Sequence, residues 1–422
     1  MIVIYMLAAI AVLFRLSLTF GDRRFAWIAT ALVVTSQGVS LVYYGRQVLG
    51  EVPGLLFLLG GLVLWFAAGE RAGYAKLSLI GLLFGLAVVT KNQYLLLMVP
   101  TIGIAWVVNL IYYRLMPQRF FIVPGIVMGI CYALWQVYIV LYLGPDTAME
   151  NLVLLRNATA GAALVFSPEL MKQSFGQLFG LNLYLGWLLP ALLYAFFQAL
   201  PRNRKSQFLG ILVIFTAFNL LWFVVASVGW LRYAFVGLVF GGLFVARLFL
   251  DMIGGAERRL PRIGEILQAP ARGQIGPALQ ATAAVILAAM IVLPLAQSAL
   301  DTLRPGENTP LAMARFMDAE VPEDALVETW EPEMGFLTDH KYHYPPAGLL
   351  NTAVGYIWLD GPPPADSYDF VQTEMPEYVL VGEFARWVDL YPADTLAESY
   401  VSVTQIGAYE LYERVDQSQQ GD

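Results

Sequence analysis

The chain has 422 residues, of which 58% are hydrophobic, and a formal net charge of −7 at pH 7. Its mean hydropathy of +0.63 excludes an ordinary soluble protein, because too few polar side chains remain to cover a surface in water. The single cysteine, Cys131, excludes an intrachain disulfide and a cysteine-based metal site.

Long apolar runs recur along the first 299 residues. Runs of about 17–25 residues are the length that a helix needs to cross a bilayer, and they lack the alternation of barrel strands. We therefore predict an all-α polytopic membrane bundle of about ten spans. The predicted spans are 2–19, 25–44, 53–69, 77–91, 94–113, 120–143, 181–200, 207–226, 232–250 and 278–299.

Basic residues gather in alternate loops between these spans. The loops are "GDRRF", "ERAGYAK", "YYRLMPQRF", "PRNRKSQ" and the stretch 251–277. Cytoplasmic loops carry the excess of Lys and Arg, so this side is expected to be cytoplasmic. Loops 45–52 and 144–180 and the end of the chain would then be external, periplasmic or extracellular. The first span would run inward, so a preceding in-to-out span is expected upstream of this sequence.

The charge divides the chain into two parts. Residues 1–300 hold 20 Lys and Arg against 9 Asp and Glu, whereas residues 301–422 hold 5 against 23. We predict a transmembrane domain over 1–299 and an external, soluble α/β domain over 300–422. A domain this acidic excludes nucleic acid as a partner.

The acidic domain shows both helix and strand patterns. "TPLAMARFMDAEV" has a helical period, and "DALVETW" and "EYVLVGEF" are strand-like runs. "SYVSVTQIGAYELYERV" predicts a hairpin. "DHKYHYPP" holds His340 and His343 beside Asp339, which is either a metal site or a plain surface loop.

Three basic residues next to predicted spans are exceptions to the rule that Lys and Arg concentrate on the cytoplasmic side. Arg46 in "YYGRQVLGEVPG", Lys91 in "GLLFGLAVVTK" and Arg232 in "GWLRYAFVG" are all expected at the external end. Charges at membrane depth are costly, and three of them at one depth could converge on a lipid-linked phosphate. The alternative is that each reaches out to lipid head groups. Glu51 either pairs with Arg46 or starts the helix at Pro53.

Three short sequence motifs occur in the order found in a known family. They are "GEVP", "GLLFGLAVVTK" and the "RY" before a late span. In this the chain resembles polyprenyl-phosphate-sugar-dependent glycosyltransferases of the C superfamily, which include protein mannosyltransferase-like and aminoarabinose transferase-like enzymes. The resemblance implies transfer of a hexose or pentose from a polyprenyl-phosphate donor to a hydroxyl. The acceptor would be a glycan, lipid or protein at the external membrane face. It implies no cofactor beyond this donor and leaves a divalent metal open.

The resemblance also assigns roles. Glu51 matches the acidic residue of the second external loop and is the candidate catalytic residue. Arg46, Lys91, Arg232 and Tyr233 are candidates for binding substrate. The family's general base lies in the first external loop, which this chain is expected to lack. The chain by itself is therefore expected to be inactive as a transferase. If it does transfer sugar, the base would have to be Glu51 or another external acid such as Asp146. The competing hypothesis is a non-catalytic membrane protein: a transporter, a lipid-handling protein or an inactive relative.

Overall fold

The structure is a computed structural model that describes most of the chain. It describes residues 2–45, 50–153, 164–180, 183–254, 276–304, 306, 308–359 and 361–415. The chain divides into two compact units. The first comprises Met1–Ala148 and Val165–Ala299, and the second comprises Met149–Leu164 and Leu300–Asp422.

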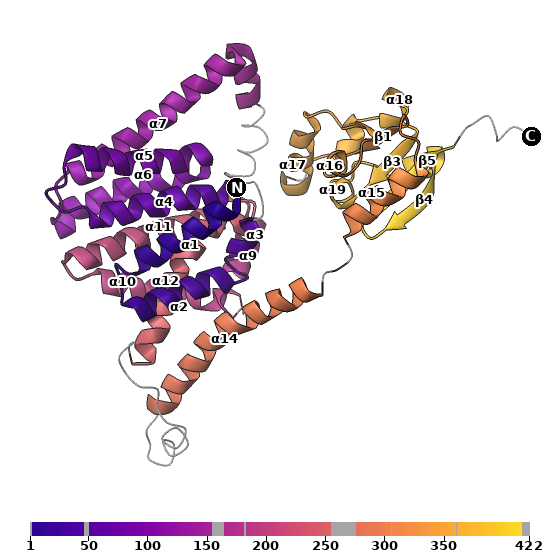
Figure 1. Ribbon diagram of the computed structural model, residues 1–422. Helices are drawn as coiled ribbons and strands as arrows, with labels where there is room; N and C mark the ends of the chain where they lie inside the picture. Colours follow the sequence, from indigo (N-terminus) through magenta and orange to yellow (C-terminus); the bar gives the residue numbers. More distant parts are fainter. Residues whose placement is uncertain are drawn as a thin grey trace, which may run out of the picture. The chain divides into compact units, whose positions relative to one another are not determined.

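The first unit is a bundle of helices (Figure 1). Its α-helices are α1 (Ile2–Ser17), α2 (Arg23–Thr35), α3 (Leu41–Tyr44), α4 (Glu51–Ala67), α5 (Tyr74–Thr90), α6 (Gln93–Val108), α7 (Arg119–Leu143), α9 (Pro168–Phe179), α10 (Leu188–Ala199), α11 (Arg204–Ala226), α12 (Phe235–Met252) and α14 (Gly276–Leu303). A π-helical turn, η1 (Asn109–Tyr113), prolongs α6, and 3-10 turns η2 (Leu185–Trp187) and η3 (Leu231–Ala234) precede α10 and α12.

Five of the helical segments are long and apolar enough to cross a membrane. They are Gln93–Tyr113, Arg119–Leu143, Arg204–Ala226, Leu231–Met252 and Gly276–Leu303. The chain is thus a multi-pass membrane protein. Four shorter apolar helices, Val3–Ser17, Glu51–Ala67, Tyr74–Thr90 and Leu185–Ala199, lie in four more of the predicted spans.

The predicted span 25–44 is not one continuous helix. It divides into α2 with 13 residues and α3 with 4 residues. Ser40, between them, adopts a left-handed conformation with φ of 55°. The polar sequence "TSQGVS" interrupts the apolar run at this point. The count of ten spans therefore stays a prediction.

Small residues allow close helix packing in the bundle. A Cβ atom on Gly81 would lie 2.6 Å from the Val127 Cβ, and one on Gly85 would lie 2.5 Å from the Cys131 Cβ. These contacts join α5 to α7, which is how small residues bring membrane helices together. The indole of the fully buried Trp65 donates a hydrogen bond to the Phe120 carbonyl at 2.8 Å, which ties α4 to α7.

The second unit is an α/β domain with a mixed sheet. Its strands are β1 (Leu326–Thr329), β2 (Lys341–His343), β3 (Tyr378–Val381), β4 (Tyr400–Ile406) and β5 (Tyr409–Arg414), in the order β2-β1-β3-β5-β4. Its helices are α15 (Thr309–Glu320), α16 (Met334–Leu337), α17 (Leu349–Leu359), α18 (Phe370–Thr373), α19 (Glu383–Trp387) and α20 (Ala393–Ser399), with a 3-10 turn η5 (Pro364–Ser367). β1 is parallel to β2 and β3, and β5 is antiparallel to β3 and β4.

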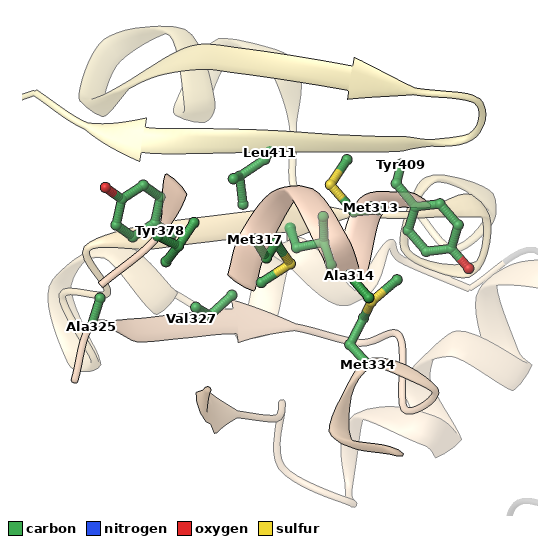
Figure 2. Packing of buried hydrophobic residues seen from close by; sticks show 11 residues of the cluster. Met313, Ala314, Met317, Ala325, Val327, Met334, Tyr378, Tyr409 and Leu411 are labelled. Carbon is green, nitrogen blue, oxygen red and sulfur yellow. The ribbon is translucent and has the colours of Figure 1, made fainter. Parts of the chain in front are cut away.

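Hydrophobic residues cover both faces of this sheet. On one face α15 contributes Met313 and Met317, which pack with Val327 and Leu411 (Figure 2). Alternate residues of a strand point to opposite faces, so the other residues of β3, such as Val379, join a second cluster that includes Phe370. This two-faced burial explains why all four residues of β3 are buried.

Most predicted elements of this domain are confirmed. The helix in "TPLAMARFMDAEV" is α15, the two strand-like runs are β1 and β3, and the hairpin is formed by β4 and β5. The description of "DHKYHYPP" as a surface loop is wrong, because Lys341–His343 forms β2 and His340 is buried. Three residues are too few to show a strand period, and the parallel partner β1 supplies the hydrogen bonds.

Candidate functional site

Glu51 and Lys91 form an ion pair at one end of the bundle. Glu51 is the first residue of α4 and only 2% exposed, and Lys91 follows the last residue of α5. One carboxylate oxygen of Glu51 contacts the Lys91 Nζ, while the other, Oε2, is buried without a hydrogen-bond partner among the described residues. Of the two roles expected for Glu51, the position at the start of a helix is confirmed, because α4 begins at this residue. The other role, pairing with Arg46, falls outside the described residues.

Gly50 brings these two helix ends together. Its φ of +80° is a left-handed conformation that glycine adopts without strain. A Cβ atom at this position would lie 2.8 Å from the Thr90 carbonyl oxygen, so no other residue fits without a shift. The Tyr94 hydroxyl also donates a hydrogen bond to the Glu51 carbonyl at 2.6 Å. The ion pair therefore rests on a close contact between α4, α5 and the start of α6.

Arg232 lies in η3 among aromatic rings. Its guanidinium carbon is 4.2 Å from the centre of the Trp230 ring and 5.5 Å from that of Tyr233. Its Nε is buried and has no hydrogen-bond partner within the described part of the chain. A planar guanidinium held against aromatic faces keeps its edge free to bind an anion.

Two amide side chains, the partly buried Gln93 and the fully buried Asn219, fix the position of η3. Gln93 Nε2, from the start of α6, donates to the Tyr233 carbonyl at 2.7 Å. Asn219 Nδ2 donates to the same carbonyl at 2.8 Å, and Asn219 Oδ1 accepts from the Gly237 amide at 2.6 Å. Neither residue was predicted from the sequence. An Asn within the apolar run "TAFNLLW" was the available signal, because an unpaired amide in a membrane is costly.

The charges of these elements act on one another. Arg232 lies within electrostatic range of Lys91, and Tyr44 lies within range of both Glu51 and Arg232. The Tyr44 ring also packs edge-on against Phe235, with 5.3 Å between ring centres. The structure thus brings Glu51, Lys91 and Arg232 to one region, although they are up to 181 residues apart in sequence.

An open groove of about 530 Å³ lies beside Arg232. Its lining residues are Tyr43, Tyr44, Gln177, Gly229, Trp230, Leu231 and Arg232. Tyr43 and Tyr44 lie in α3 at the start of "YYGRQVLGEVPG", and Gln177 lies in α9. None of the three was predicted as a site residue, because only the charged residues of these segments were considered. The groove offers one cation, several aromatic faces and an amide, which suits an anion attached to an apolar or sugar-like group.

A separate polar cluster occupies the α/β domain. Glu328 of β1 is fully buried and accepts hydrogen bonds from Tyr368 at 2.9 Å and Tyr391 at 3.0 Å. His343 Nδ1 lies 2.5 Å from the Glu328 Oε2, and His343 Nε2 lies 3.6 Å from Glu374. Burial raises the pKa of the Glu328 carboxyl, although these hydrogen bonds oppose the rise.

The two histidines do not join in a metal cluster in the part of the chain that the structure describes. His343 faces Glu328, whereas His340 lies 3.6 Å from Asp318. No group of three His, Cys, Asp or Glu side chains among the described residues could hold a metal ion.

The fold is similar to that of known membrane glycosyltransferases. ArnT from Cupriavidus metallidurans bound to undecaprenyl phosphate matches with a TM-score of 0.58 and 13% identity, over 99% of this chain and 83% of ArnT. ArnT in the apo state matches with a TM-score of 0.55, 13% identity and coverage of 98% and 83%.

The archaeal oligosaccharyltransferase AglB from Archaeoglobus fulgidus, in complex with an inhibitory peptide and a dolichol-phosphate, matches with a TM-score of 0.50 and 14% identity. The match covers 99% of this chain, which spans 63% of AglB. No family model and no curated protein matches the sequence. The chain therefore has the fold of C-superfamily glycosyltransferases.

Proposed function

We propose that this membrane protein with a C-superfamily fold transfers a sugar from a polyprenyl-phosphate donor to a hydroxyl of a glycan, lipid or protein. The observation that carries the proposal is the groove beside Arg232, with the Glu51–Lys91 pair in the same region but outside the lining of the groove. The similar structures of ArnT and AglB contain undecaprenyl phosphate and dolichol-phosphate, which supports a donor of this class.

The chemistry explains why a cation is needed at this groove. The acceptor hydroxyl attacks the anomeric carbon, and the bond from that carbon to the phosphate oxygen breaks, with the electron pair staying on this oxygen. The hydroxyl proton passes to the phosphate product or to water. A phosphodiester with one negative charge becomes a monoester that carries up to two. Arg232 would stabilise this added charge as it develops in the transition state. The Tyr233 ring and carbonyl hold Arg232 and η3 in place.

Glu51 and Lys91 have a second role in this proposal. Glu51 is buried and paired, so it holds the Lys91 ammonium toward the region of Arg232 and does not reach into the groove itself. Lys91 is 20% exposed and adds positive charge to the phosphate side. We therefore assign Glu51 as a positioning residue for Lys91, with proton removal from the acceptor as the competing role. Arg46 remains a proposed contact to the donor head group.

A pair of matched arginine variants tests the proposal. Arg202 also stacks on an aromatic ring, with its guanidinium carbon 4.6 Å from the Tyr112 ring centre, but it does not line the groove. The assay follows release of radiolabelled sugar from a polyprenyl-phosphate donor in proteoliposomes. Removing one preorganised electrostatic contact typically costs about 10²–10³-fold in kcat, so Arg232→Gln should lose this much. Arg202→Gln should keep the wild-type rate.

Two results would contradict the proposal. The first is no sugar release or transfer by the wild-type protein with any polyprenyl-phosphate sugar. The second is an equal loss in the Arg232→Gln and Arg202→Gln proteins. Arg232→Lys separates charge from shape, because lysine keeps the charge but not the planar stack on Trp230.

The proposal also places the groove and the α/β domain on the external side. The basic loops between spans support this orientation. In a Cys131→Ala background, an impermeant thiol reagent should label Asp366→Cys in intact cells and should leave Arg71→Cys unlabelled. Both positions are exposed, so the opposite labelling pattern would reverse the orientation.

A further inference from the structure

A second cavity lies at the other ends of α11 and α12. Its volume is about 220 Å³. It is lined where α11 starts, at Lys205 and Leu212, and where α12 ends, at Phe244 and Arg247. Arg232 lies 15 residues before Arg247, and at 1.5 Å per helical residue the two ends are about 20 Å apart. This cavity is therefore separate from the groove of the proposed transferase site.

The lining of this cavity is amphipathic. Lys205, Arg247 and the amide of Gln198 supply charged and polar groups. Phe20, in the turn after α1, and Phe25, near the start of α2, supply apolar surface. A small water-soluble anion needs no such apolar wall. A ligand with a charged head and a hydrocarbon tail uses both kinds of surface.

Lys205, near the start of α11, differs from the neighbouring Arg202 and Arg204 in its contacts. Arg202 stacks on the Tyr112 ring, and Arg204 donates to the Phe66 and Ala68 carbonyls at 2.9 and 2.6 Å, where α4 ends. Lys205 has no hydrogen bond or ion pair with any described residue. It lines the cavity instead.

Arg247 adds a second positive charge to the same cavity. Its Nε donates to the Asp251 Oδ2 at 2.8 Å, and this oxygen also accepts from Tyr194 at 2.7 Å and Gln198 at 3.1 Å. This oxygen of Asp251 thus already accepts three hydrogen bonds, one of them from Arg247. Lys205 and Arg247 both line this cavity and carry like charges. Two cations that repel each other across one cavity are stabilised by an anion between them.

We propose that this cavity binds the phosphate head group of an anionic phospholipid. Lys205 and the free Nη edge of Arg247 would contact the phosphate oxygens, and the first part of the acyl chain would lie against Phe20 and Phe25. A cavity of about 220 Å³ holds roughly seven water volumes, enough for a phosphate group but not for a whole lipid. The rest of the lipid would extend into the bilayer.

Native mass spectrometry of the full chain in detergent tests this assignment. The wild-type protein is titrated with phosphatidylglycerol and with phosphatidylcholine of the same chain length. It should retain one phosphatidylglycerol with a clear preference over phosphatidylcholine. Lys205→Gln should weaken phosphatidylglycerol binding by about 5–10-fold, as expected from the loss of one cation near a lipid phosphate. The matched control is Lys76→Gln, an exposed lysine outside the cavity that bonds to the Ala67 carbonyl.

Three outcomes would overturn the assignment. Equal binding of the two phospholipids excludes an anionic head-group site. An equal loss in Lys205→Gln and Lys76→Gln shows only general attraction by surface charge. Displacement of the lipid by millimolar inorganic phosphate shows an anion site without a lipid requirement. Arg232→Gln should leave phosphatidylglycerol binding unchanged, so this result stands or falls independently of the proposed transferase site.

Discussion

At the scale of single residues, the buried carboxylate of Glu51 has one satisfied oxygen and one without a partner among the described residues. Glu51→Gln should leave Lys91 without its anion and raise the KM for the donor more than it lowers kcat. Loss of a hydrogen bond to a charged group costs about 1.5–3 kcal/mol, and the protein should lose stability by this order. Donor kinetics and denaturation in mixed micelles measure the two effects.

A catalytic base at Glu51 would give a different result. The acidic limb of the pH–rate profile would disappear, and kcat would fall by about 10²–10⁴-fold with the donor KM unchanged. Glu70→Gln is the control for stability, because Glu70 is exposed and makes no ion pair with a described residue. A change at an exposed position of this kind costs less than about 0.5 kcal/mol.

Glu328 should make the stability of the α/β domain decrease as the pH rises. Its pKa is raised in the folded state, so the folded chain holds this proton more tightly than the unfolded chain. Stability from this group is therefore present at acid pH and is lost as the pH rises from the ordinary value of 4.5 through the folded pKa. Hydrogen exchange of the β1 amides, corrected for the intrinsic rate, should show less protection at neutral pH than at pH 4.5.

The Glu328→Gln variant should flatten this dependence, because the amide does not ionise. Glu413→Gln should retain it, since Glu413 is exposed on β5 and bonds only the Tyr378 hydroxyl among the described residues. Protection that rises with pH in the wild type, or that is equally flat in both variants, would show that another group controls β1.

At the scale of elements, the start of α4 depends on Gly50. Gly50→Ala would force a side chain into a left-handed conformation and against the Thr90 carbonyl. Such strain costs about 1–3 kcal/mol, and the Glu51–Lys91 pair should separate with it. Thermal unfolding and the donor KM measure these effects. Gly73→Ala is the matched control, because Gly73 has φ of −73° and a Cβ there meets no atom within 4 Å. Equal behaviour of the two variants would contradict the role of Gly50.

The sequence predicted elements better than the contacts between them. Run length and period located the apolar helices, α15, β1, β3 and the β4–β5 hairpin, because burial of one face leaves a local pattern. The strand β2 was missed because it depends on its distant partner β1. The break of span 25–44 was missed although the polar sequence "TSQGVS" marks it locally. The Glu51–Lys91 pair joins residues 40 apart and follows from the Gly50 contact, which no local pattern shows.

At the scale of the whole molecule, two charge distributions define the protein. The bundle carries excess positive charge, and the α/β domain carries a large negative charge. The bundle places cations at both ends of α11 and α12: Arg232 beside one groove and Lys205 with Arg247 in another cavity. We propose that both bind lipid phosphates, the first as a reactive donor and the second as a bound phospholipid.

Direct binding of polyprenyl phosphate to the 422-residue chain tests the central claim most directly. Native mass spectrometry should show one undecaprenyl phosphate on the wild-type protein and no comparable binding of the uncharged undecaprenol. Arg232→Gln should weaken this binding by at least about 10-fold, which corresponds to the loss of one charge-assisted hydrogen bond. Arg202→Gln and Lys205→Gln should bind as the wild type does. Equal affinity for the phosphate and the alcohol, or an undiminished affinity in Arg232→Gln, would contradict the account.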